Sequence, residues 1–587
     1  MSEITRRRFV RDSGLVLAGG AAAAAFNPKR AGASSGAGRR VVVLGGGMAG
    51  LAAAHELIER GFRVTVYEPV ALGGKARSIP VAGTARGGRR DLPGEHGFRF
   101  FPGFYHHVPD TMRRIPFRGN ANGVHDNLVA ASGGKFLRAN GRADGGPFGL
   151  GPDPSEVLTV DGLRQYLLDN LGGKTVPPHE LAFFVERLLV FLTSCDQRRF
   201  GEWEYVNWWD FVRADRMSGE YQKLLAKGLT ADLVAAKADI ASTRTIGNMG
   251  EAFVMNILGQ GNDGALDRVL NAPTNEAWID PWVRYLRRQG VVFRLGQQVT
   301  GLEMHRGRVS SVKLRNRHGS VHTVDDFDWV ISAMPMERAR ALWSPQVLAA
   351  DPGLKRMDDL FADWMVGVQF YLRKSVNITK GHIDFIDAPW ALTALTQGQF
   401  WSHHRFRRDF GDGKVADCLS VDISNWDEPG IVYGKPAKEC TRQQIVHEVW
   451  AQIKAHKTAG DQLPDGILHS TFMDPAVKWH PAHHHNTNDT PLLVNTAGSW
   501  VNRPTSRSKI PNLFLSGDYV QTNIDLATME GGNESGRAAV NSLLEVSGSH
   551  EAKVRMFELY KPPELAALKA ADSALYEAGL KNALDVL

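Results

Sequence analysis

A glycine-rich turn near the start of the chain constrains its fold more than any other feature. Residues 41–44, Val-Val-Val-Leu, form a short apolar run that is typical of a buried parallel strand. Gly45, Gly47 and Gly50 follow with the spacing G-x-G-x-x-G, and residues 51–60 show a helical pattern. In such a turn the first glycine permits a sharp bend, the second lets the backbone approach a pyrophosphate, and the third lets the helix pack on the strand.

The residues around this helix complete a nucleotide-binding unit. Residues 63–67 indicate a second strand that ends at Glu68, whose carboxylate suits ribose hydroxyls. The helix N-terminus, with Met48 and Ala49 beside the last glycine, offers unpaired N–H groups to phosphates. The alternative is a glycine-rich turn without a ligand. Strand, glycines, helix, strand and acid in this order favour a dinucleotide site in an α/β fold.

The next two segments resemble those of the FAD-dependent amine oxidase and phytoene desaturase superfamily. Residues 72–78, Leu-Gly-Gly-Lys-Ala-Arg-Ser, resemble its G-G-[RK]-x-x-S element, and residues 94–103 resemble the segment that runs along the flavin. The resemblance implies a Rossmann-like domain that binds FAD. The cofactor contacts that it implies here are Gly73, Gly74, Lys75 and Gly94.

Distant segments resemble the same superfamily in the same order. Residues 291–302 resemble a strand pair that touches the adenine region, and residues 327–335 resemble a strand that returns to the nucleotide. Residues 510–519 resemble the C-terminal strand with its Gly-Asp pair, and residues 528–537 resemble the helix whose N-terminus faces the flavin. The resemblance therefore implies further cofactor contacts at Val299, Ala333, Gly517, Asp518, Met529 and Glu530.

A finer resemblance concerns the middle of the chain. Residues 381–393, 397–401 and 523–531 resemble actinobacterial phytoene-dehydrogenase-like and hydroxysqualene-dehydroxylase-like proteins. The superfamily resemblance as a whole implies a discontinuous FAD-binding domain with an inserted α+β substrate-binding domain. We expect a signal peptide and linker at 1–37, FAD-binding segments at 38–115, 270–340 and 495–548, substrate-domain segments at 116–269 and 341–494, and a helical tail at 549–587.

Flavin dehydrogenation requires few protein groups, because the cofactor carries the difficult chemistry. Candidates for acid–base work are Glu95, His96 and Arg99, which lie in the segment expected along the flavin. Structural hydrogen bonding at the flavin is the alternative role for these side chains.

Candidates for substrate contact are Asp384, Asp387 and Trp390, in the segment most similar to the desaturase-like proteins. A surface strand and turn is the alternative. All 14 tryptophans lie between Trp203 and Trp500, which predicts a large apolar pocket in the inserts. For the dense cluster Trp203, Tyr205, Trp208 and Trp209, we expect core packing between helices, with an aromatic wall for a long apolar substrate as the alternative. Adjacent histidines at 483–485 rarely converge on one ion, so we predict no metal site.

Three functions fit these patterns. The first is an FAD-dependent oxidoreductase that transfers a hydride from an apolar, isoprenoid or carotenoid-like substrate to the flavin. The second is a flavin amine oxidase, and the third is a flavin-dependent double-bond isomerase or a non-catalytic FAD-binding protein. The tryptophan-rich inserts favour the first function, because an amine oxidase needs a pocket with a carboxylate group for its cationic substrate.

The N-terminal residues predict export. Residues 5–11, Thr-Arg-Arg-Arg-Phe-Val-Arg, resemble the twin-arginine motif, and an apolar stretch and small residues follow. The twin-arginine machinery carries folded proteins, so FAD binding in the cytoplasm is compatible with a location in the cell envelope or outside the cell. A cytoplasmic, membrane-associated protein is the alternative. The net charge of +6 over 587 residues is a mild excess that favours a membrane surface and no nucleic-acid partner.

Overall fold

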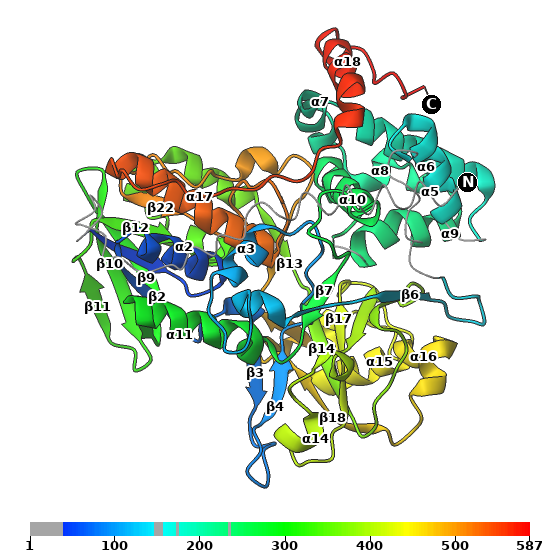
Figure 1. Cartoon of the computed structure of the whole chain (residues 1–587), viewed down its shortest axis with the longest axis horizontal. Coiled ribbons are helices and arrows are strands. Elements are labelled where there is room, and N and C mark those ends of the chain that lie inside the picture. Colours follow the sequence, from blue (N-terminus) through cyan, green and yellow to red (C-terminus); the bar gives the residue numbers. More distant parts are fainter. Residues whose placement is uncertain (1–38, 146–156, 172–174, 233–235, 587) are drawn as a thin grey trace, which may run out of the picture.

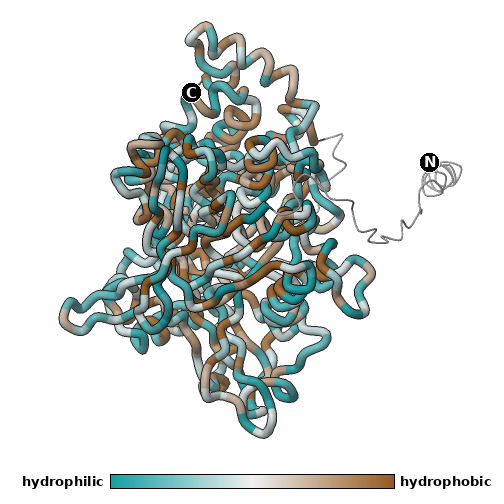
Figure 2. Tube along the Cα trace, turned by 90° about the vertical axis from the view of Figure 1, so that its left-hand side faces the viewer, coloured by the Kyte–Doolittle hydropathy of each residue, from teal (hydrophilic) through white to brown (hydrophobic). Residues whose placement is uncertain are grey.

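The computed structural model describes residues 39–145, 157–171, 175–232 and 236–586. Figure 1 shows a parallel sheet with its helices on the left, a mixed sheet at the lower right and a group of helices at the upper right. Figure 2 shows hydrophobic segments in the interior and hydrophilic residues on projecting loops. The chain has several separate hydrophobic cores, as expected from its length.

The parallel sheet has five strands in the order β22–β12–β1–β2–β8, and every neighbouring pair is parallel. Its strands are β1 (Arg40–Leu44), β2 (Arg63–Glu68), β8 (Val292–Leu295), β12 (Trp329–Ser332) and β22 (Leu513–Leu515). Val41 and Val43 pack toward the helices, whereas Val42 and Leu44 pack on the opposite face. Both faces of β1 are covered, which explains its uninterrupted apolar sequence.

Three helices cover one face of this sheet, and a small antiparallel sheet covers the other. The helices are α2 (Met48–Glu59), α11 (Asp280–Gln289) and α17 (Met529–Ser547), and the small sheet consists of β9 (Gln297–His305), β10 (Arg308–Asn316) and β11 (Val321–Val324). Helices α12 (Met336–Ala339) and α13 (Pro345–Ala350) lie on the side of the small sheet.

The mixed sheet has six strands in the order β18–β14–β17–β16–β15–β6, antiparallel except for the β15–β6 pair. Its strands are β6 (Gly133–Leu137), β14 (Val366–Leu372), β15 (Gly381–Phe385), β16 (Leu392–Thr396), β17 (Asp417–Ile423) and β18 (Leu468–Met473). One face is apolar and packs on α15 (Arg442–Lys454) and α16 (Lys457–Gln462). The other face is turned toward the parallel-sheet part of the molecule.

The third part is helical. It consists of α5 (Val160–Asn170), α6 (Pro178–Thr193), α7 (Asp196–Gly201), α8 (Trp208–Phe211), α9 (Gly219–Tyr221), α10 (Thr243–Ile257) and, from the end of the chain, α18 (Ala566–Glu577). Leu565 is buried in the core of this group, so the C-terminal tail is part of the helical layer.

Short elements connect these parts. They are α3 (His107–Arg113), α14 (Phe406–Asp409), and the strand pairs β3 (Ser78–Val81) with β4 (Leu92–Glu95), β5 (Leu128–Ala130) with β7 (Arg268–Leu270), β13 (Phe361–Asp363) with β21 (Leu492–Val494), and β19 (Val477–His480) with β20 (His485–Asn488). No helix among the described segments combines the length and the apolar character that a membrane crossing requires.

The predicted fold class is confirmed: the chain forms an α/β structure with a Rossmann-like parallel sheet and an inserted mixed sheet. The strands of the parallel sheet come from three separate stretches of sequence, and β6 brings the first insert into the sheet of the second. The domain boundaries stay predictions. The signal sequence lies outside the described residues.

Candidate functional site

Glycine shapes the turn between β1 and α2 at its first and last motif positions. Gly45 has a φ of +111°, and a Cβ there would lie 2.5 Å from the carbonyl oxygen of Ala333. A Cβ on Gly50 would lie 2.0 Å from the carbonyl oxygen of Gly45. Both positions therefore require glycine for the fold itself. No side chain of the described residues caps the N-terminus of α2, so its first N–H groups and its positive dipole end are available to an anion.

Gly47 is different, because the space beside it is open. A Cβ there would find nothing nearer than the Cα of Gly74, at 3.7 Å. Gly74 belongs to a second glycine turn, which is held to the first by a 2.8 Å hydrogen bond from the Gly73 amide to the Gly46 carbonyl. The two turns form a backbone-lined cradle at the N-terminus of α2, suited to a pyrophosphate.

Glu68 lies at the edge of this cradle, at the end of β2. Its Oε2 accepts a 2.9 Å hydrogen bond from the Gly46 amide, and its Oε1 accepts a 2.8 Å bond from the Val70 amide. These bonds fix the carboxylate against the first turn. Its contact with a ribose stays a prediction.

Two glycines of α17 let this helix lie directly on α2. A Cβ on Gly532 would lie 3.1 Å from the Cβ of Met48, and one on Gly536 would lie 2.6 Å from the carbonyl oxygen of Ala49. The close approach brings the N-termini of both helices to the same place. Sequence reasoning missed Gly532 and Gly536, although their four-residue spacing on one helix face was a usable signal.

The first turn of α17 is capped on the inside of the molecule. Thr528 accepts a 3.0 Å hydrogen bond from the Gly531 amide. The buried carboxylate of Glu530 accepts hydrogen bonds from the amides of residues 106–108, at the start of α3. Glu530 thus ties α17 to α3. The predicted cofactor contacts of Glu530 and Met529 are untested by this geometry and stay predictions.

Further predicted contacts lie at the carboxyl ends of the parallel strands, where ligands of such sheets bind. Gly517 follows β22 with a φ of +142°, and a Cβ there would lie 3.0 Å from the Met334 carbonyl oxygen. Asp518 is partly exposed beside it. Lys75 donates a hydrogen bond to the Pro491 carbonyl, next to β21. Val299 is half-buried in β9.

The predicted catalytic segment crosses from β4 onto the mixed sheet. Gly94 is required there, because a Cβ would lie 2.6 Å from the Phe472 ring of β18. Glu95 is buried, and its carboxylate accepts hydrogen bonds from the Thr274 amide at 3.0 Å, the Thr274 hydroxyl at 2.9 Å and the Ser78 hydroxyl at 3.1 Å. These contacts support the structural role that we gave as the alternative for Glu95.

His96 and Arg99 make different contacts. The Nδ1 of His96 lies 2.8 Å from the Oδ2 of Asp474, just after β18. Arg99 donates a 2.5 Å hydrogen bond to the Lys75 carbonyl and so links the catalytic segment to the second glycine turn. The structure therefore brings all three predicted catalytic residues to the boundary between the mixed sheet and the cradle.

The face of the mixed sheet below this segment is polar although it is buried. Asp422 of β17 is paired with Gly367 on one side and with Thr393 on the other, and Thr393 is paired with Asp384. Residues paired across strands share a face, so Asp422 and Asp384 lie on the same face. The next row of this face contains Gln369 and Ser420.

Several atoms of this polar face and of the catalytic segment above it lack a hydrogen-bond partner among the described residues: Asp422 Oδ1, Ser420 Oγ and Gln369 Nε2 on the face, and His96 Nε2 and Arg99 Nε in the segment. Burial raises the pKa of Asp422 to about 7 and that of Asp384 to about 7. Buried polar groups without partners are costly in a finished structure, so their clustering indicates a place where a ligand is bound. Asp422 was missed by sequence reasoning, although polar residues alternate in β17.

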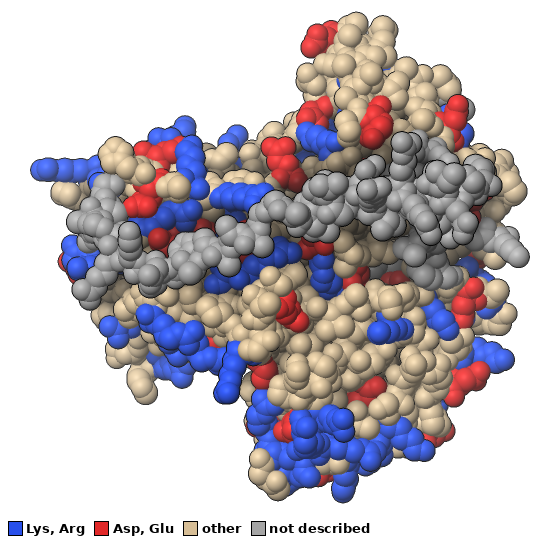
Figure 3. Space-filling view, viewed as in Figure 1, with Lys and Arg blue, Asp and Glu red and all other residues tan. Residues whose placement is uncertain are grey.

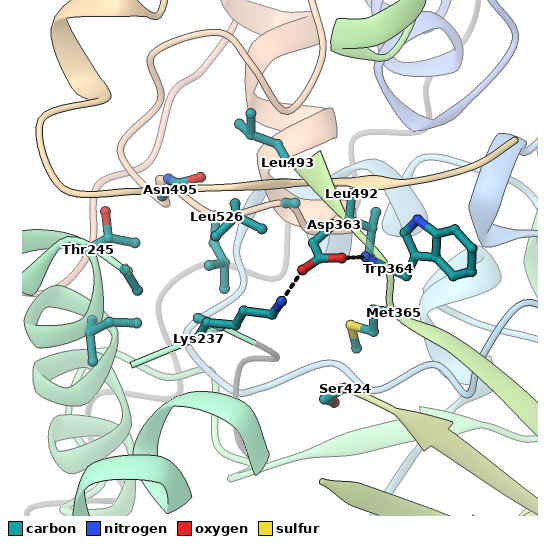
Figure 4. Close-up of a pocket in the computed structure, with 15 residues that line it drawn as sticks. Lys237, Thr245, Asp363, Trp364, Met365, Ser424, Leu492, Leu493, Asn495 and Leu526 are labelled. Atoms are coloured by element: carbon teal, nitrogen blue, oxygen red, sulfur yellow. Dashed lines mark hydrogen bonds and ion pairs between the residues drawn. The ribbon is translucent and has the colours of Figure 1, made fainter. Parts of the chain in front are cut away.

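A largely apolar cavity lies at one end of this face (Figure 4). It lies between α10, β13, β21 and the residues just before α17, and its walls include Ile246, Trp364, Met365, Leu492 and Leu526. Lys237 and Asp363 form an ion pair at its side, as the dashed line in Figure 4 shows. A second, smaller cavity lies at the other end of the face and is lined by Glu95, Arg99, Leu395, Phe400 and Trp401.

Comparison with known proteins decides the family. The model of the flavin-containing amine oxidoreductases matches residues 48–544. This chain belongs to that family. It is also similar to the zeta-carotene desaturase of Synechocystis sp., with 21% identity over 525 residues that cover 85% of this chain and 96% of the relative.

Solved structures share the fold of this flavin oxidoreductase. Cyclohexylamine oxidase from Brevibacterium oxydans IH-35A is 13% identical, with a TM-score of 0.54 over 87% of this chain and 99% of the other. A putative protoporphyrinogen oxidase from Exiguobacterium sp. 255-15 is 17% identical, with a TM-score of 0.53 over 86% and 99%. At these identities the likeness concerns the fold alone.

The cofactor of this family is FAD, and the cradle fits it. The open space beside Gly47, the uncapped N-terminus of α2 and the converging N-terminus of α17 are features that a diphosphate and its sugars require. When bound, FAD would supply the two-electron chemistry. No group of three His, Cys, Asp or Glu side chains within the described segments is arranged to hold a metal ion.

The predicted substrate residues divide between two places. Asp384 lies on the polar face, but Asp387 and Trp390 line neither cavity. Burial acts to raise the pKa of Asp387, but hydrogen bonds from Arg138 and the Ala139 amide outweigh it and hold the pKa at about 2. Trp390 is fully buried in the core on the opposite, apolar face. The contacts of Asp387 and Trp390 in the described part of the chain are structural, and their contact with a substrate stays a prediction.

Few tryptophans line the two cavities, and most of the others are buried in the hydrophobic cores. Trp364 lines the first cavity and Trp401 the second. Trp203 and Trp208 are buried in the helical core, and Trp278 stacks on Trp282 beneath the parallel sheet. Core packing, which we expected for the cluster that contains Trp203 and Trp208, describes most of the tryptophans.

Proposed function

We propose that this flavin oxidoreductase dehydrogenates an apolar, isoprenoid-like substrate by hydride transfer to FAD. The observation that carries the proposal is the first cavity, whose apolar walls end at residues 526–527, directly before the helix that packs on the cradle. A chain of carbon atoms would gain about 25 cal/mol per Å² of surface buried there. Similarity to a desaturase over nearly the whole chain supports the same substrate class.

Amine oxidation is the second candidate, and the polar face favours it. Asp422 and Asp384 form no ion pair with a cation in the described part of the chain, so an ammonium group would find a counter-charge there. Their raised pKa values weaken this candidate, because a carboxyl group that is partly neutral at pH 7 attracts a cation less.

Anaerobic mixing of the holoenzyme with panels of isoprenoids and amines tests the proposal. We expect an isoprenoid to bleach the visible absorbance of the flavin and amines to leave it unchanged, because the one carboxylate in the lining of the first cavity, Asp363, is already paired with Lys237 and Lys438. Bleaching by amines alone would select the amine oxidase. Bleaching by neither would select the isomerase or the non-catalytic FAD-binding protein.

We further propose export through the twin-arginine machinery and residence at an anionic membrane. Figure 3 shows Lys and Arg side chains gathered at the lower end of the molecule, near the β3–β4 loop and α14. Exposed arginines in these segments are Arg86, Arg90, Arg405, Arg407 and Arg408. A basic surface is attracted to anionic lipids, in which isoprenoid substrates dissolve.

A fusion of residues 1–40 to a folded reporter tests the export signal. We expect the reporter to leave the cytoplasm, and the double variant Arg6→Lys, Arg7→Lys to retain it, because the translocon reads the guanidinium pair and not the charge alone. Cell fractionation of the two fusions measures the difference. Equal export of both would show that the twin-arginine interpretation is wrong.

A further inference from the structure

His96 and Asp474 form a buried pair that joins the catalytic segment to the end of β18. The Nδ1 of His96 lies 2.8 Å from the Oδ2 of Asp474, although the residues are 378 positions apart in the chain. The other oxygen of Asp474 accepts a 2.7 Å hydrogen bond from the Ala476 amide. With both oxygens engaged, Asp474 holds the imidazole in one orientation and favours the tautomer with the proton on Nδ1.

The remaining nitrogen of His96 has no partner among the described residues. The residue is 7% exposed, and Nε2 makes no hydrogen bond within the described segments. In the Nδ1–H tautomer, Nε2 presents a lone pair to the interior. A buried acceptor without a donor is costly, so this atom is placed for a group that the chain itself does not supply.

The surroundings of His96 place that group beside the cradle and the first cavity. Its carbonyl accepts a 2.9 Å hydrogen bond from the Gly367 amide, and Met365, two residues earlier, lines the first cavity. Lys75, which follows the glycines of the second turn, lies close enough to lower the pKa of His96. The backbone of His96 is therefore tied to the strand that follows a wall residue of the first cavity, and its imidazole lies within electrostatic reach of Lys75 at the second glycine turn.

Burial and the positive charges around the pair lower the pKa of His96 and so favour the neutral imidazole. Burial lowers the pKa of His96, the Asp474 carboxylate opposes this, and the positive charges of Arg99 and Lys75 lower it further, with a net decrease. On the far side, Arg77 and Arg442 face Asp474. Burial acts to raise the pKa of Asp474, but the interactions with His96, the hydrogen bond from the Ala476 amide and the charge of Arg77 together outweigh it and lower the pKa.

We propose that His96 is the base of the reaction and that Asp474 is its positioning residue. This inference rests on the proposed function. When a C–H bond of the substrate breaks and its electron pair leaves as a hydride to FAD, the adjacent carbon must lose a proton so that the new double bond can form. Nε2 of His96 accepts that proton, and the resulting imidazolium is stabilised by the Asp474 carboxylate.

The reductive half-reaction tests the assignment. We expect His96→Gln to slow flavin reduction by about 100-fold or more and to abolish the rising limb of its pH profile, because glutamine cannot take up a proton. Asp474→Asn should move that limb to lower pH, because losing the negative charge lowers the pKa of His96. His469→Gln is the matched control. His469 lies in β18, and its Nε2 is 3.2 Å from the Oδ2 of another aspartate, Asp412. The rate of flavin reduction in this variant should stay within about twofold of the wild-type rate.

Two measurements keep the assignment independent of the substrate. FAD content and the visible spectrum of each variant separate a lost base from a lost cofactor site. NMR of ¹³C-labelled histidine in the holoenzyme without substrate should show a neutral His96 with its proton on Nδ1 at pH 7.5, and Asp474→Asn should disturb that signal. An imidazolium at His96 throughout pH 6–9, or an unchanged pH profile in His96→Gln, would overturn the proposal. Failure of every substrate to reduce the wild-type flavin would instead overturn the proposed function.

Discussion

Gly47→Val is expected to give a folded, colourless protein that has lost FAD. A Cβ at this position meets no atom closer than 3.7 Å, so the fold has room for a larger side chain. The same space is where the cradle must receive the diphosphate, and an isopropyl group would occupy it. We expect FAD affinity to fall by at least about 100-fold, which corresponds to about 2.7 kcal/mol. Flavin absorbance per mole of purified protein and titration of the apoprotein with FAD measure the loss.

Two further glycines give this prediction its controls. Gly250 of α10 also has open space around it, so Gly250→Val should retain FAD and stability. Gly50→Val should fail at folding instead, because its Cβ would lie 2.0 Å from the Gly45 carbonyl oxygen. A yellow Gly47→Val protein with wild-type flavin content would contradict the placement of the diphosphate in the cradle.

Asp525→Asn is expected to destabilise the protein severely. Asp525 is 1% exposed and precedes the residues that line the first cavity. Its carboxylate pairs with Arg503 and with Arg244, which are themselves buried, and accepts a 2.6 Å hydrogen bond from Thr245. Neutralising it would leave Arg503 without an ion-pair partner in the described segments. Breaking a buried pair in this way costs about 3–5 kcal/mol of unfolding free energy.

Asparagine is the right replacement, because Asp525 has a φ of +49°, which asparagine tolerates better than alanine does. The control is Asp427→Asn. Its side chain is 45% exposed, and its partners Lys237 and Lys438 both keep Asp363, so the loss should stay below about 1 kcal/mol. Urea denaturation followed by circular dichroism compares the two. Equal unfolding free energies would show that the Asp525 network does not hold this part of the fold.

The contrast between Asp384 and Asp387 shows how far sequence reasoning reached in the substrate region. Both lie in one short segment, and no feature of the neighbouring sequence predicts that the two carboxylates have different contacts. The register of β15 places Asp384 on the polar face, whereas Asp387 follows the strand and meets Arg138 and Arg142 from the first insert. The partners that decide the roles are about 245 residues or more away in sequence, so no spacing rule predicts them.

The sequence by itself determined the cofactor cradle. The cradle depends on the backbone conformation of three glycines, Gly45, Gly47 and Gly50, and on the close approach of neighbouring backbone atoms. Such local requirements can be predicted from residue type and spacing. The parallel sheet follows from the same unit. Only the tertiary structure shows why Gly532 and Gly536 must be small: α17 packs directly on α2 at these two positions.

Only the tertiary structure decided which polar side chains act together. Asp474 meets His96, and Gly97 and Gly367 leave room for Asp422, because three strands of the second insert pair in one particular register beneath the catalytic segment. A shift of one residue in that register would turn Asp422 to the apolar face. Sequence spacing fixes backbone conformation over a few residues, but a site assembled across strands depends on the packing of the whole sheet.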